Sequence, residues 1–149
     1  MPSGALHRLV YMSTAVGVLR ADELDRIYLR AQSANTRAGI TGLLLFYEGA
    51  FLQALEGPAG GVTSLAEKIR RDRRHSGIIT LESAPIEERA FPDSPMRFVA
   101  ARNLSSGEKQ AFSDLRMAVS ARSHMNGAPA PDADNGLWAF ISSFGLRTA

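Results

Sequence analysis

The clearest hydrophobic pattern in the chain lies in residues 39–57, GITGLLLFYEGAFLQALEG. Two apolar runs, at about 40–47 and 50–56, flank the dipeptide Glu48-Gly49. Apolar runs of this length, joined by a short turn that contains glycine, are typical of a β-hairpin. The pattern therefore predicts two adjacent antiparallel strands with their turn at Glu48 and Gly49.

One polar residue interrupts the second of these strands. Successive side chains of a strand point to opposite faces, so Phe51, Gln53 and Leu55 lie on the same face. Both neighbours of Gln53 on that face are apolar, and an amide buried there without a hydrogen bond costs about 1–3 kcal/mol. Gln53 must therefore find a polar partner.

Further periodic segments extend the hairpin to a complete domain. Apolar residues at helical spacing follow Ala21, the stripe ends at Asn35, and Gly39 then suits the end of a helix. The other expected elements are strands at 6–13, 77–86 and 95–102 and, after a break at GPAGG (57–61), a helix at about 62–73. The order βαββαββ predicts an α+β domain of ferredoxin-like type, a mixed sheet with two helices on one face.

The last third of the chain has a different pattern. A moderately amphipathic helix is expected at 105–123, and the stretch 124–136, rich in Pro, Gly and Ala, is typical of a linker. The very apolar segment 137–146 must pack on the domain, on the preceding helix or on a second chain. We expect a domain at 1–103 and a helical extension at 104–149 that docks on the other face of the sheet.

Composition narrows the possible functions. The 149 residues have a formal net charge of +2, which by itself does not indicate a nucleic-acid-binding surface. Without cysteine there is no thiol catalysis and no disulfide, and the three histidines, His7, His75 and His124, lack the spacing of metal ligands. Because the sequence shows no signal peptide and no apolar run long enough to span a membrane, we expect a cytoplasmic protein.

Three polar residues lie on faces that are otherwise apolar. Tyr11 is in the first strand, Asn35 ends the apolar stripe of the first helix, and Gln53 is in the hairpin. One such residue is usually paired within the fold, but three that face the layer between sheet and helices indicate a planar, polar ligand held between the two helices. Asp72, one turn beyond Ile69, lies close to the same layer.

Five motifs follow one another through these elements. They are LVYMS with Tyr11, AQSANTRAGITGLLLF with Asn35, YEGAFLQALEG with Gln53, IRRDRRHSGI with Asp72, Arg74 and His75, and PMRFVA with Met96. Together they resemble the BLUF family, the flavin-binding sensors of blue light. The resemblance covers roughly residues 5–103 and implies a ferredoxin-like fold that holds the flavin between its two helices.

The resemblance implies a role for each of these residues. Gln53 would bridge the Tyr11 hydroxyl and the flavin edge, and Asn35 would hold the isoalloxazine ring by hydrogen bonds. Blue light would move an electron, coupled to a proton, from Tyr11 to the flavin and back, leaving the Gln53 amide rearranged and the absorption shifted to the red. No substrate is consumed, so the chain is expected to be a sensor and not an enzyme. The flavin-binding set would be completed by Asp72, Arg74 and His75 along the ring and ribityl side and by Ile27 and Ile69 on the ring faces.

One position departs from the family pattern. Where many relatives have a tryptophan the chain has Ser94, followed by Pro95, and its only tryptophan is Trp138. Met96 is therefore expected to be the first relay of the signal from Gln53. FAD is the expected flavin, with FMN and riboflavin as alternatives. Output is expected through contacts with an unidentified signalling protein, from a homodimer or a higher homo-oligomer.

Three other functions occur on this fold class. A ferredoxin-like interaction module without a cofactor would be colourless. An RNA-binding sheet needs exposed aromatic pairs, whose usual motif Phe46, Tyr47 and Phe51 do not reproduce. A small enzyme of the acylphosphatase type needs a phosphate-binding loop with an arginine after the first strand, and no such loop is visible there. The interaction module is the main alternative to the photoreceptor.

Overall fold

The computed structural model describes residues 5–17, 20–92, 96–100 and 103–123. Within these ranges the elements follow one another in the order βαββαββα. The first seven occur in the order expected from the sequence. The elements are β1 Leu6–Ala15, α1 Ala21–Ala38, β2 Thr41–Tyr47, β3 Ala50–Pro58, α2 Ala59–Arg71, β4 His75–Ile86, β5 Arg97–Val99 and α3 Ser106–Ser123.

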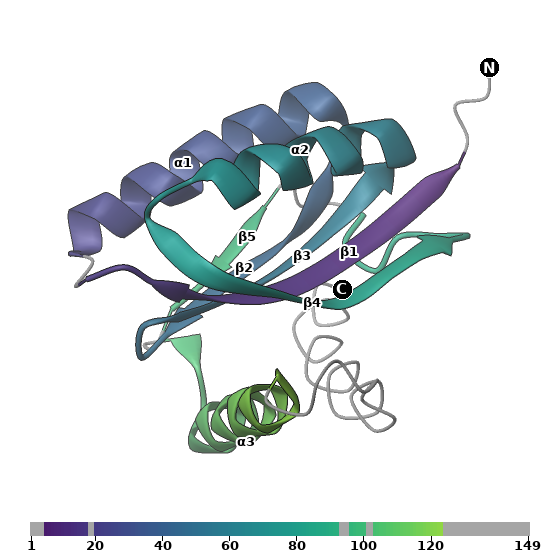
Figure 1. Ribbon diagram of the computed structural model, residues 1–149. Coiled ribbons are helices and arrows are strands. Elements are labelled where there is room, and N and C mark those ends of the chain that lie inside the picture. The colour runs from purple at the N-terminus through teal and green to yellow at the C-terminus, as the bar shows by residue number, and fades with distance from the viewer. Residues whose placement is uncertain (1–4, 18–19, 93–95, 101–102, 124–149) are drawn as a thin grey trace. The chain divides into compact units, whose positions relative to one another are not determined.

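A single mixed sheet has the strand order β4-β1-β3-β2-β5, and α1 and α2 cover one of its faces (Figure 1). β1 pairs antiparallel with both β3 and β4, and β2 pairs antiparallel with β3. The short β5 pairs parallel with β2 at the edge of the sheet. The predicted ferredoxin-like arrangement is confirmed, and β3 lies at its centre.

The hairpin between β2 and β3 has the turn that the sequence predicts. Glu48 and Gly49 both have positive φ values, 48° and 77°, as in the two-residue turn that matches the twist of a hairpin. Tyr47 is opposite Ala50, which sets the register of the whole pair. A one-residue slip would turn every side chain of β3 to the other face, so this turn determines which face Gln53 occupies.

Helix α1 ends in a glycine cap that positions its last buried residue. Gly39 adopts the left-handed conformation (φ 71°), and its N–H donates a shared hydrogen bond to the carbonyl oxygens of Asn35 and Thr36. The N–H of Ile40 donates to the Asn35 carbonyl at 2.8 Å. Asn35 is the fully buried residue of α1. The sharp helix end therefore brings an amide side chain into the layer between helices and sheet.

Helix α2 differs from its prediction at both ends. It was expected at 62–73, after a break at 57–61, but the helix starts directly after Pro58 and stops two residues earlier. Glycine lowers helix stability by about 1 kcal/mol per residue, which made the sequence look like a break. The buried residues Val62 and Ala66 pack against the sheet and offset that cost.

Strands β4 and β5 also have different ends from those expected. β4 begins at His75 instead of residue 77, because Gly77 (φ 61°) lies where the register of β1 shifts between Met12 and Thr14. A glycine at a bulge lets the strand continue instead of ending it. The strand expected at 95–102 is shorter, and parts of that range lie outside the described residues.

An apolar cluster fills the space between the sheet and its two helices. The opposite face of the central strands is also buried, as Val10, Leu45 and Leu52 show with no exposed surface. Burial on both faces explains the unbroken apolar runs within these strands, residues 9–12 of β1 and 43–46 of β2. The buried members of the cluster on the helical side are Leu9, Ile40, Leu44, Phe51, Leu55, Val62, Ala66 and Met96.

The chain divides into two compact units, Met1–Ala100 and Ala101–Ala149. Within the second unit the structure describes α3, which agrees with the helix expected at 105–123. The expected linker at 124–136 and the apolar segment at 137–146 lie outside the described residues. The domain limits predicted above, and the docking of the extension on the sheet, stay predictions.

Candidate functional site

A cavity of about 270 Å³ opens between α1, α2 and the sheet. Its walls are largely apolar, and they include the polar side chains of Tyr11, Asn35 and Gln53. All eight residues that the sequence predicts for flavin binding line it, and Met96 contacts one of them. Those eight are Tyr11, Ile27, Asn35, Gln53, Ile69, Asp72, Arg74 and His75, and the cavity is completed by Arg30, Ala31, Ala34, Leu44, Phe51, Leu65 and Lys68.

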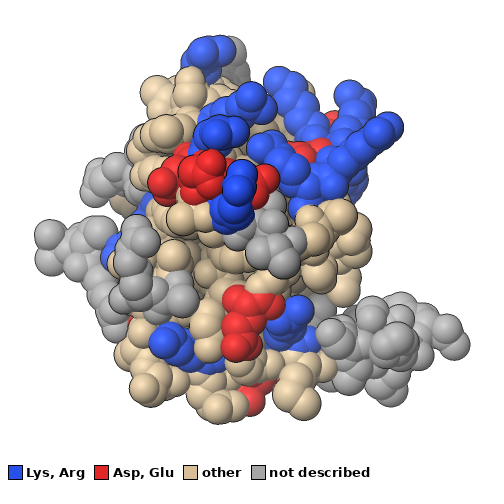
Figure 2. All heavy atoms as spheres, turned by 90° about the vertical axis from the view of Figure 1, so that its left-hand side faces the viewer, with Lys and Arg blue, Asp and Glu red and all other residues tan. Residues whose placement is uncertain are grey.

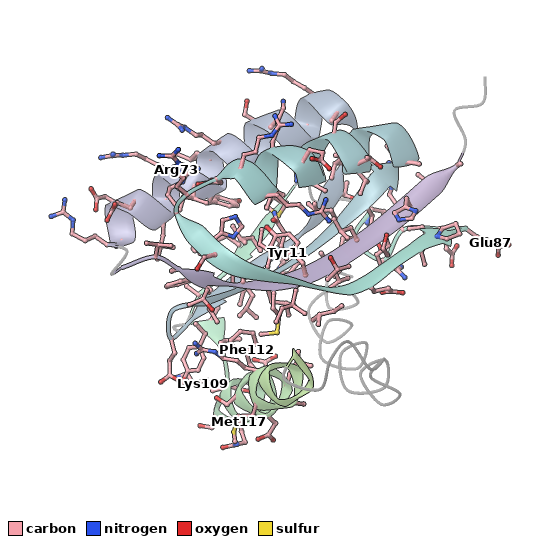
Figure 3. The ribbon with its side chains drawn as sticks, in the orientation of Figure 1. Tyr11, Arg73, Glu87, Lys109, Phe112 and Met117 are labelled. Atoms are coloured by element: carbon pink, nitrogen blue, oxygen red, sulfur yellow. The ribbon has the colours of Figure 1, made fainter. Side chains whose placement is uncertain are left out.

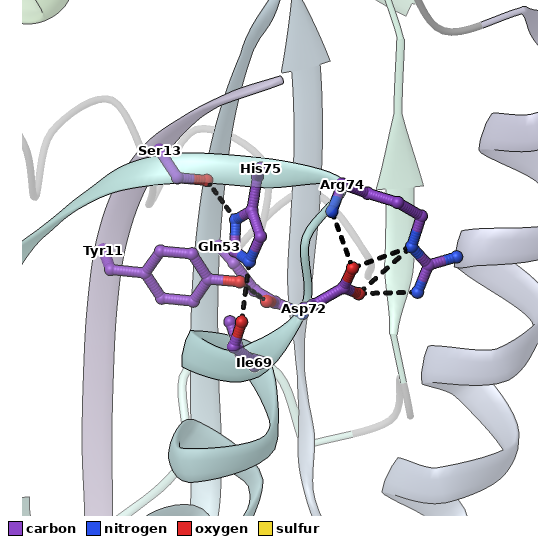
Figure 4. A network of polar contacts seen from close by, with 7 residues as sticks. All are labelled: Tyr11, Ser13, Gln53, Ile69, Asp72, Arg74 and His75. Carbon is purple, nitrogen blue, oxygen red and sulfur yellow. Dashed lines mark hydrogen bonds and ion pairs between the residues drawn. The ribbon is translucent and has the colours of Figure 1, made fainter. Parts of the chain in front are cut away.

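The strand register places a chain of three side chains at the cavity. Tyr11 and Gln53 are direct partners in the β1–β3 pair. The Tyr11 side chain lies between the sheet and the helices (Figure 3), and the Gln53 side chain lies next to it (Figure 4). The Tyr11 hydroxyl donates to Gln53 Oε1, and Gln53 Nε2 donates to Met96 Sδ at 3.7 Å. The buried amide has thus found the polar partners that its position requires.

The Tyr11 phenol stays protonated. Its burial raises its pKa well above the ordinary value near 10, and the negative charge of Asp72 raises it further. At neutral pH the hydroxyl is therefore a hydrogen-bond donor, which is the role that Gln53 Oε1 requires. The proton of Tyr11 is held in place until another group competes for it.

His75 connects the end of α2 with β1 (Figure 4). One ring nitrogen, Nε2, lies 2.8 Å from the Ile69 carbonyl, which only accepts, so Nε2 carries the proton. In the neutral ring Nδ1 then accepts from the Ser13 hydroxyl at 2.7 Å. Ser13 was not predicted as part of the site, although it follows Tyr11 by two residues and so lies on the same face of the strand.

Asp72 and Arg74 form an ion pair beside the cavity. Arg74 donates to Asp72 from Nη2 at 2.6 Å, from Nε at 2.9 Å and from its backbone N–H at 2.9 Å. These hydrogen bonds lower the pKa of Asp72, against the opposing effect of its partial burial. The same contact raises the pKa of Arg74. The carboxylate is therefore charged and mostly neutralised by its partner.

The donor set and the shape of the cavity fit a flavin ring. Ile27 and Ile69 supply apolar walls from the two helices, and the amides of Asn35 and Gln53 offer both donors and acceptors to a polar edge. The volume of about 270 Å³ lies just below the usual range of ligand pockets, roughly 300–1,000 Å³. It suits a fused ring system rather than a whole dinucleotide.

Two other kinds of site receive no support from the part of the chain that the structure describes. No group of three His, Asp or Glu side chains there could hold a metal ion. In the same ranges no helix has the length and apolar character to cross a membrane. Ser94, Pro95 and Trp138, the positions that depart from the family pattern, lie outside the described residues.

Comparison with known proteins identifies the domain. Residues 6–97 match the BLUF family model, described as sensors of blue light using FAD. The chain is 41% identical over 98 residues to the photoactivated adenylate cyclase subunit alpha of Euglena gracilis, covering 66% of this chain and 10% of that protein. It thus spans about a tenth of the length of the curated relatives it matches.

Solved structures show the same fold at higher coverage. BlrB, a BLUF protein in its dark state, is 29% identical with a TM-score of 0.71, and the match covers 93% of this chain and 96% of that one. A bacterial light-regulated adenylyl cyclase is 33% identical with a TM-score of 0.70, over 80% of this chain and 35% of that one. The chain belongs to the BLUF family of blue-light sensors that use FAD.

Proposed function

We propose that this chain senses blue light through the orientation of one amide, the side chain of Gln53. The observation that carries the proposal is the continuous contact from Tyr11 through Gln53 to Met96 at the wall of one cavity. A bound flavin supplies absorption of blue light and reversible electron acceptance. The protein supplies the orientation and the hydrogen bonds around it.

The residues that hold the flavin are those of the cavity. Asn35 and Gln53 bind its polar edge, and Ile27 and Ile69 enclose the ring. His75 lines the same cavity, and both of its ring nitrogens are engaged within the protein, by Ile69 and Ser13. We propose that it fixes the end of α2 against β1 and so keeps the cavity open. The polar side of the cavity is completed by Asp72 and Arg74.

Reorientation of Gln53 changes both of its contacts at once. In the structure its oxygen accepts from Tyr11 and its nitrogen donates to Met96. After half a turn of the amide, the nitrogen faces the Tyr11 oxygen and donates to it, so the Tyr11 proton must find another acceptor. The amide oxygen then faces the Met96 sulfur, and since both are acceptors that contact is lost. Met96 is thereby sensitive to the state of the switch.

Output takes place through contacts between proteins and not through catalysis by this chain. Five expectations from the sequence form part of this proposal. They are a BLUF domain at 1–103, an extension at 104–149 that transmits the signal, a separate signalling partner, a homo-oligomeric state and a cytoplasmic location. The relatives named as adenylate cyclases are far longer than this chain. A chain truncated after residue 102 tests the transmitter: unchanged light-dependent partner binding would exclude the extension from that role.

Absorption spectra of the purified protein before and under blue light test the switch. We expect a yellow protein whose absorption shifts to the red and recovers in the dark, with the shift lost in Tyr11→Phe and Gln53→Leu. Tyr28 and Gln32 provide a control, since they form another Tyr–Gln pair, in which Gln32 Nε2 donates to the Tyr28 hydroxyl at 3.1 Å on α1, without lining the cavity. Tyr28→Phe and Gln32→Leu should keep the shift.

Other outcomes of these spectra are equally informative. A yellow protein whose absorption does not shift under blue light would support the flavin-binding cavity and contradict the proposed role of Gln53. A colourless protein that takes up no added flavin would overturn the proposal in favour of the interaction module.

A further inference from the structure

Arg89, in the segment that leads from β4 to β5, joins three separate parts of the chain. Its Nη2 donates to the carbonyl oxygen of Gly39 at 2.8 Å, and its Nη1 donates to Thr41 Oγ1 at 2.9 Å and to the carbonyl oxygen of Glu56 at 3.2 Å. Gly39 caps α1, Thr41 is the first residue of β2, and Glu56 belongs to β3. One guanidinium therefore connects the end of a helix to both strands of the hairpin.

Arg89 differs from the arginines of the two helices. Figure 2 shows Lys and Arg side chains gathered on the side of the molecule that carries α1 and α2, and every arginine of these helices is exposed. Arg89 is half-buried, and the backbone N–H groups of the next two residues, Ala90 and Phe91, donate to Glu56 Oε1 at 2.9 and 3.0 Å. Its backbone is thus held in place, so little further ordering is needed for its three contacts.

The chemistry of these contacts suits an arginine. Two carbonyl oxygens and a hydroxyl oxygen are all acceptors here, and a guanidinium offers five N–H donors in a planar, rigid fork. Its two terminal nitrogens reach the carbonyl of the helix cap and the carbonyl of β3 at the same time. A positive charge is also favourable at the C-terminal end of a helix, where the backbone dipoles leave partial negative charge.

The bridge spans the two elements that carry the amides of the cavity. Asn35 lies four residues before Gly39, and its backbone carbonyl accepts from the N–H of that cap. Gln53 lies three residues before Glu56 on β3. Both amide side chains line the cavity. By tying Gly39 to Glu56, Arg89 fixes the end of α1 against β3 and with it the spacing of the two amides.

We propose that Arg89 is a positioning residue for the flavin, which sets the spacing of Asn35 and Gln53 from outside the cavity. The inference rests on the proposed flavin site and adds a residue that does not line its wall. Because the bridge is formed within the protein, its loss should loosen the end of α1 even without a ligand. A ring edge that needs both amides in place should then bind more weakly, since less of the site is preorganised.

Full-length protein with Arg89→Gln tests the proposal in two measurements. In the flavin-free protein, hydrogen exchange of the Gly39 and Ile40 amides, which donate to the Asn35 carbonyl, should become about tenfold faster, because charge-assisted hydrogen bonds that hold this turn are lost. FAD, titrated into the flavin-free protein and followed by quenching of its fluorescence, should bind roughly tenfold more weakly.

Thr41→Val is the matched control. It keeps the shape of the side chain and removes one contact of Arg89, but it leaves the two carbonyl contacts that form the bridge. Amide exchange at the end of α1 and FAD affinity should therefore stay within about twofold of the wild type. Arg89→Lys takes the place of Arg89→Gln if that variant does not fold, because a single ammonium keeps the charge but lacks the fork, and both effects should keep their direction.

The outcomes separate this inference from the proposed function. Unchanged exchange of the Gly39 and Ile40 amides, exchange that rises evenly over the whole domain, or a loss of FAD affinity equal to that of Thr41→Val would overturn the positioning role and leave the sensor intact. A wild-type chain that takes up no FAD would overturn the proposed function and this inference together.

Discussion

A buried ion pair on the sheet face opposite the cavity offers a strong test of the structure. Glu56 has no exposed surface, and its Oε2 accepts from Arg8 Nε at 2.8 Å. Its Oε1 accepts from the backbone N–H groups of Ala90 at 2.9 Å and Phe91 at 3.0 Å. One carboxylate therefore joins β1, β3 and the segment that leads from β4 to β5.

The substitution Glu56→Gln keeps the shape of this side chain and removes its charge. An amide has one oxygen, so its NH₂ group must face either Arg8 or the two backbone N–H groups, and all of these are donors. Breaking a buried pair in this way costs about 3–5 kcal/mol. For the 100 residues of Met1–Ala100, an unfolding entropy near 2.1 cal/mol/K per residue converts this cost into a fall in Tm of roughly 15–25 °C.

Thermal and denaturant unfolding followed by circular dichroism measures this effect. Adding Arg8→Met to Glu56→Gln should restore part of the stability, because it removes a largely buried cation that has lost its contact with Glu56 and keeps the longer one, 3.9 Å, to Glu82. Arg26→Met is the control: its pair with Asp22 is exposed, and its loss should stay within about 0.5 kcal/mol. A loss below about 1 kcal/mol for Glu56→Gln, or a double variant as unstable as the sum of the single ones, would refute the reasoning.

Three further predictions follow from single positions. A Cβ on Gly42 would lie 1.9 Å from the Ala54 carbonyl oxygen, so Gly42→Ala should lower the free energy of unfolding by at least about 1–3 kcal/mol in a denaturant titration. A Cβ on Gly60, in α2, would lie in open space, so Gly60→Ala should raise the free energy of unfolding by roughly 0.5–1 kcal/mol. Because the pKa of Tyr11 is raised in the folded state, its contribution to the free energy of unfolding is complete below pH 10 and is lost above it at about 1.4 kcal/mol per pH unit. In Tyr11→Phe the free energy of unfolding should therefore fall less steeply at alkaline pH. Equal slopes for the two proteins would contradict the burial of the Tyr11 hydroxyl. The pKa of Asp72 is lowered in the folded state, so its contribution to folding stability is present above about pH 4 and is lost as the pH falls. The variant Asp72→Asn should therefore show a smaller difference in Tm between pH 7 and pH 3.

The sequence carries the fold because its local signals agree with one another. The two positive φ values at Glu48 and Gly49 are those that a glycine-containing turn between apolar runs predicts. The prediction was wrong where packing against distant parts of the chain outweighed the local pattern. The glycines at 57–61 indicated a break, yet burial of Val62 and Ala66 holds the helix together up to Pro58.

The site was only partly accessible to the same reasoning. Alternation and helical spacing identify Tyr11, Asn35 and Gln53 as polar residues on apolar faces, and this needs no relative. Ile27, Ile69, Asp72, Arg74 and His75 were assigned to the site from the family resemblance. The other seven members of the cavity wall were not predicted: Arg30, Ala31, Ala34, Leu44, Phe51, Leu65 and Lys68. Contacts such as Ser13 with His75 depend on the register between β1 and β4, which local pattern leaves undetermined. Pairing between distant strands is set by the whole sheet.

The strand order explains why one amide can report to the rest of the chain. Gln53 lies on β3, between β2 and β1, and Tyr11 is its neighbour on β1. Met96, the residue that directly precedes β5, accepts a hydrogen bond from Gln53 through its sulfur. β5 is the last strand of the first unit, and the chain continues from it into the second. A change at the sulfur of Met96 is therefore a change at the start of the segment that covalently joins the sensor to its extension. Because β5 is held by a short parallel pairing with β2, it has few ladder hydrogen bonds to resist a shift, in contrast to the long β1–β3 and β1–β4 pairs. In the switch that we propose, Tyr11 is therefore on the firmly paired side and Met96 is on the weakly paired side, and we infer that the signal passes toward Met96.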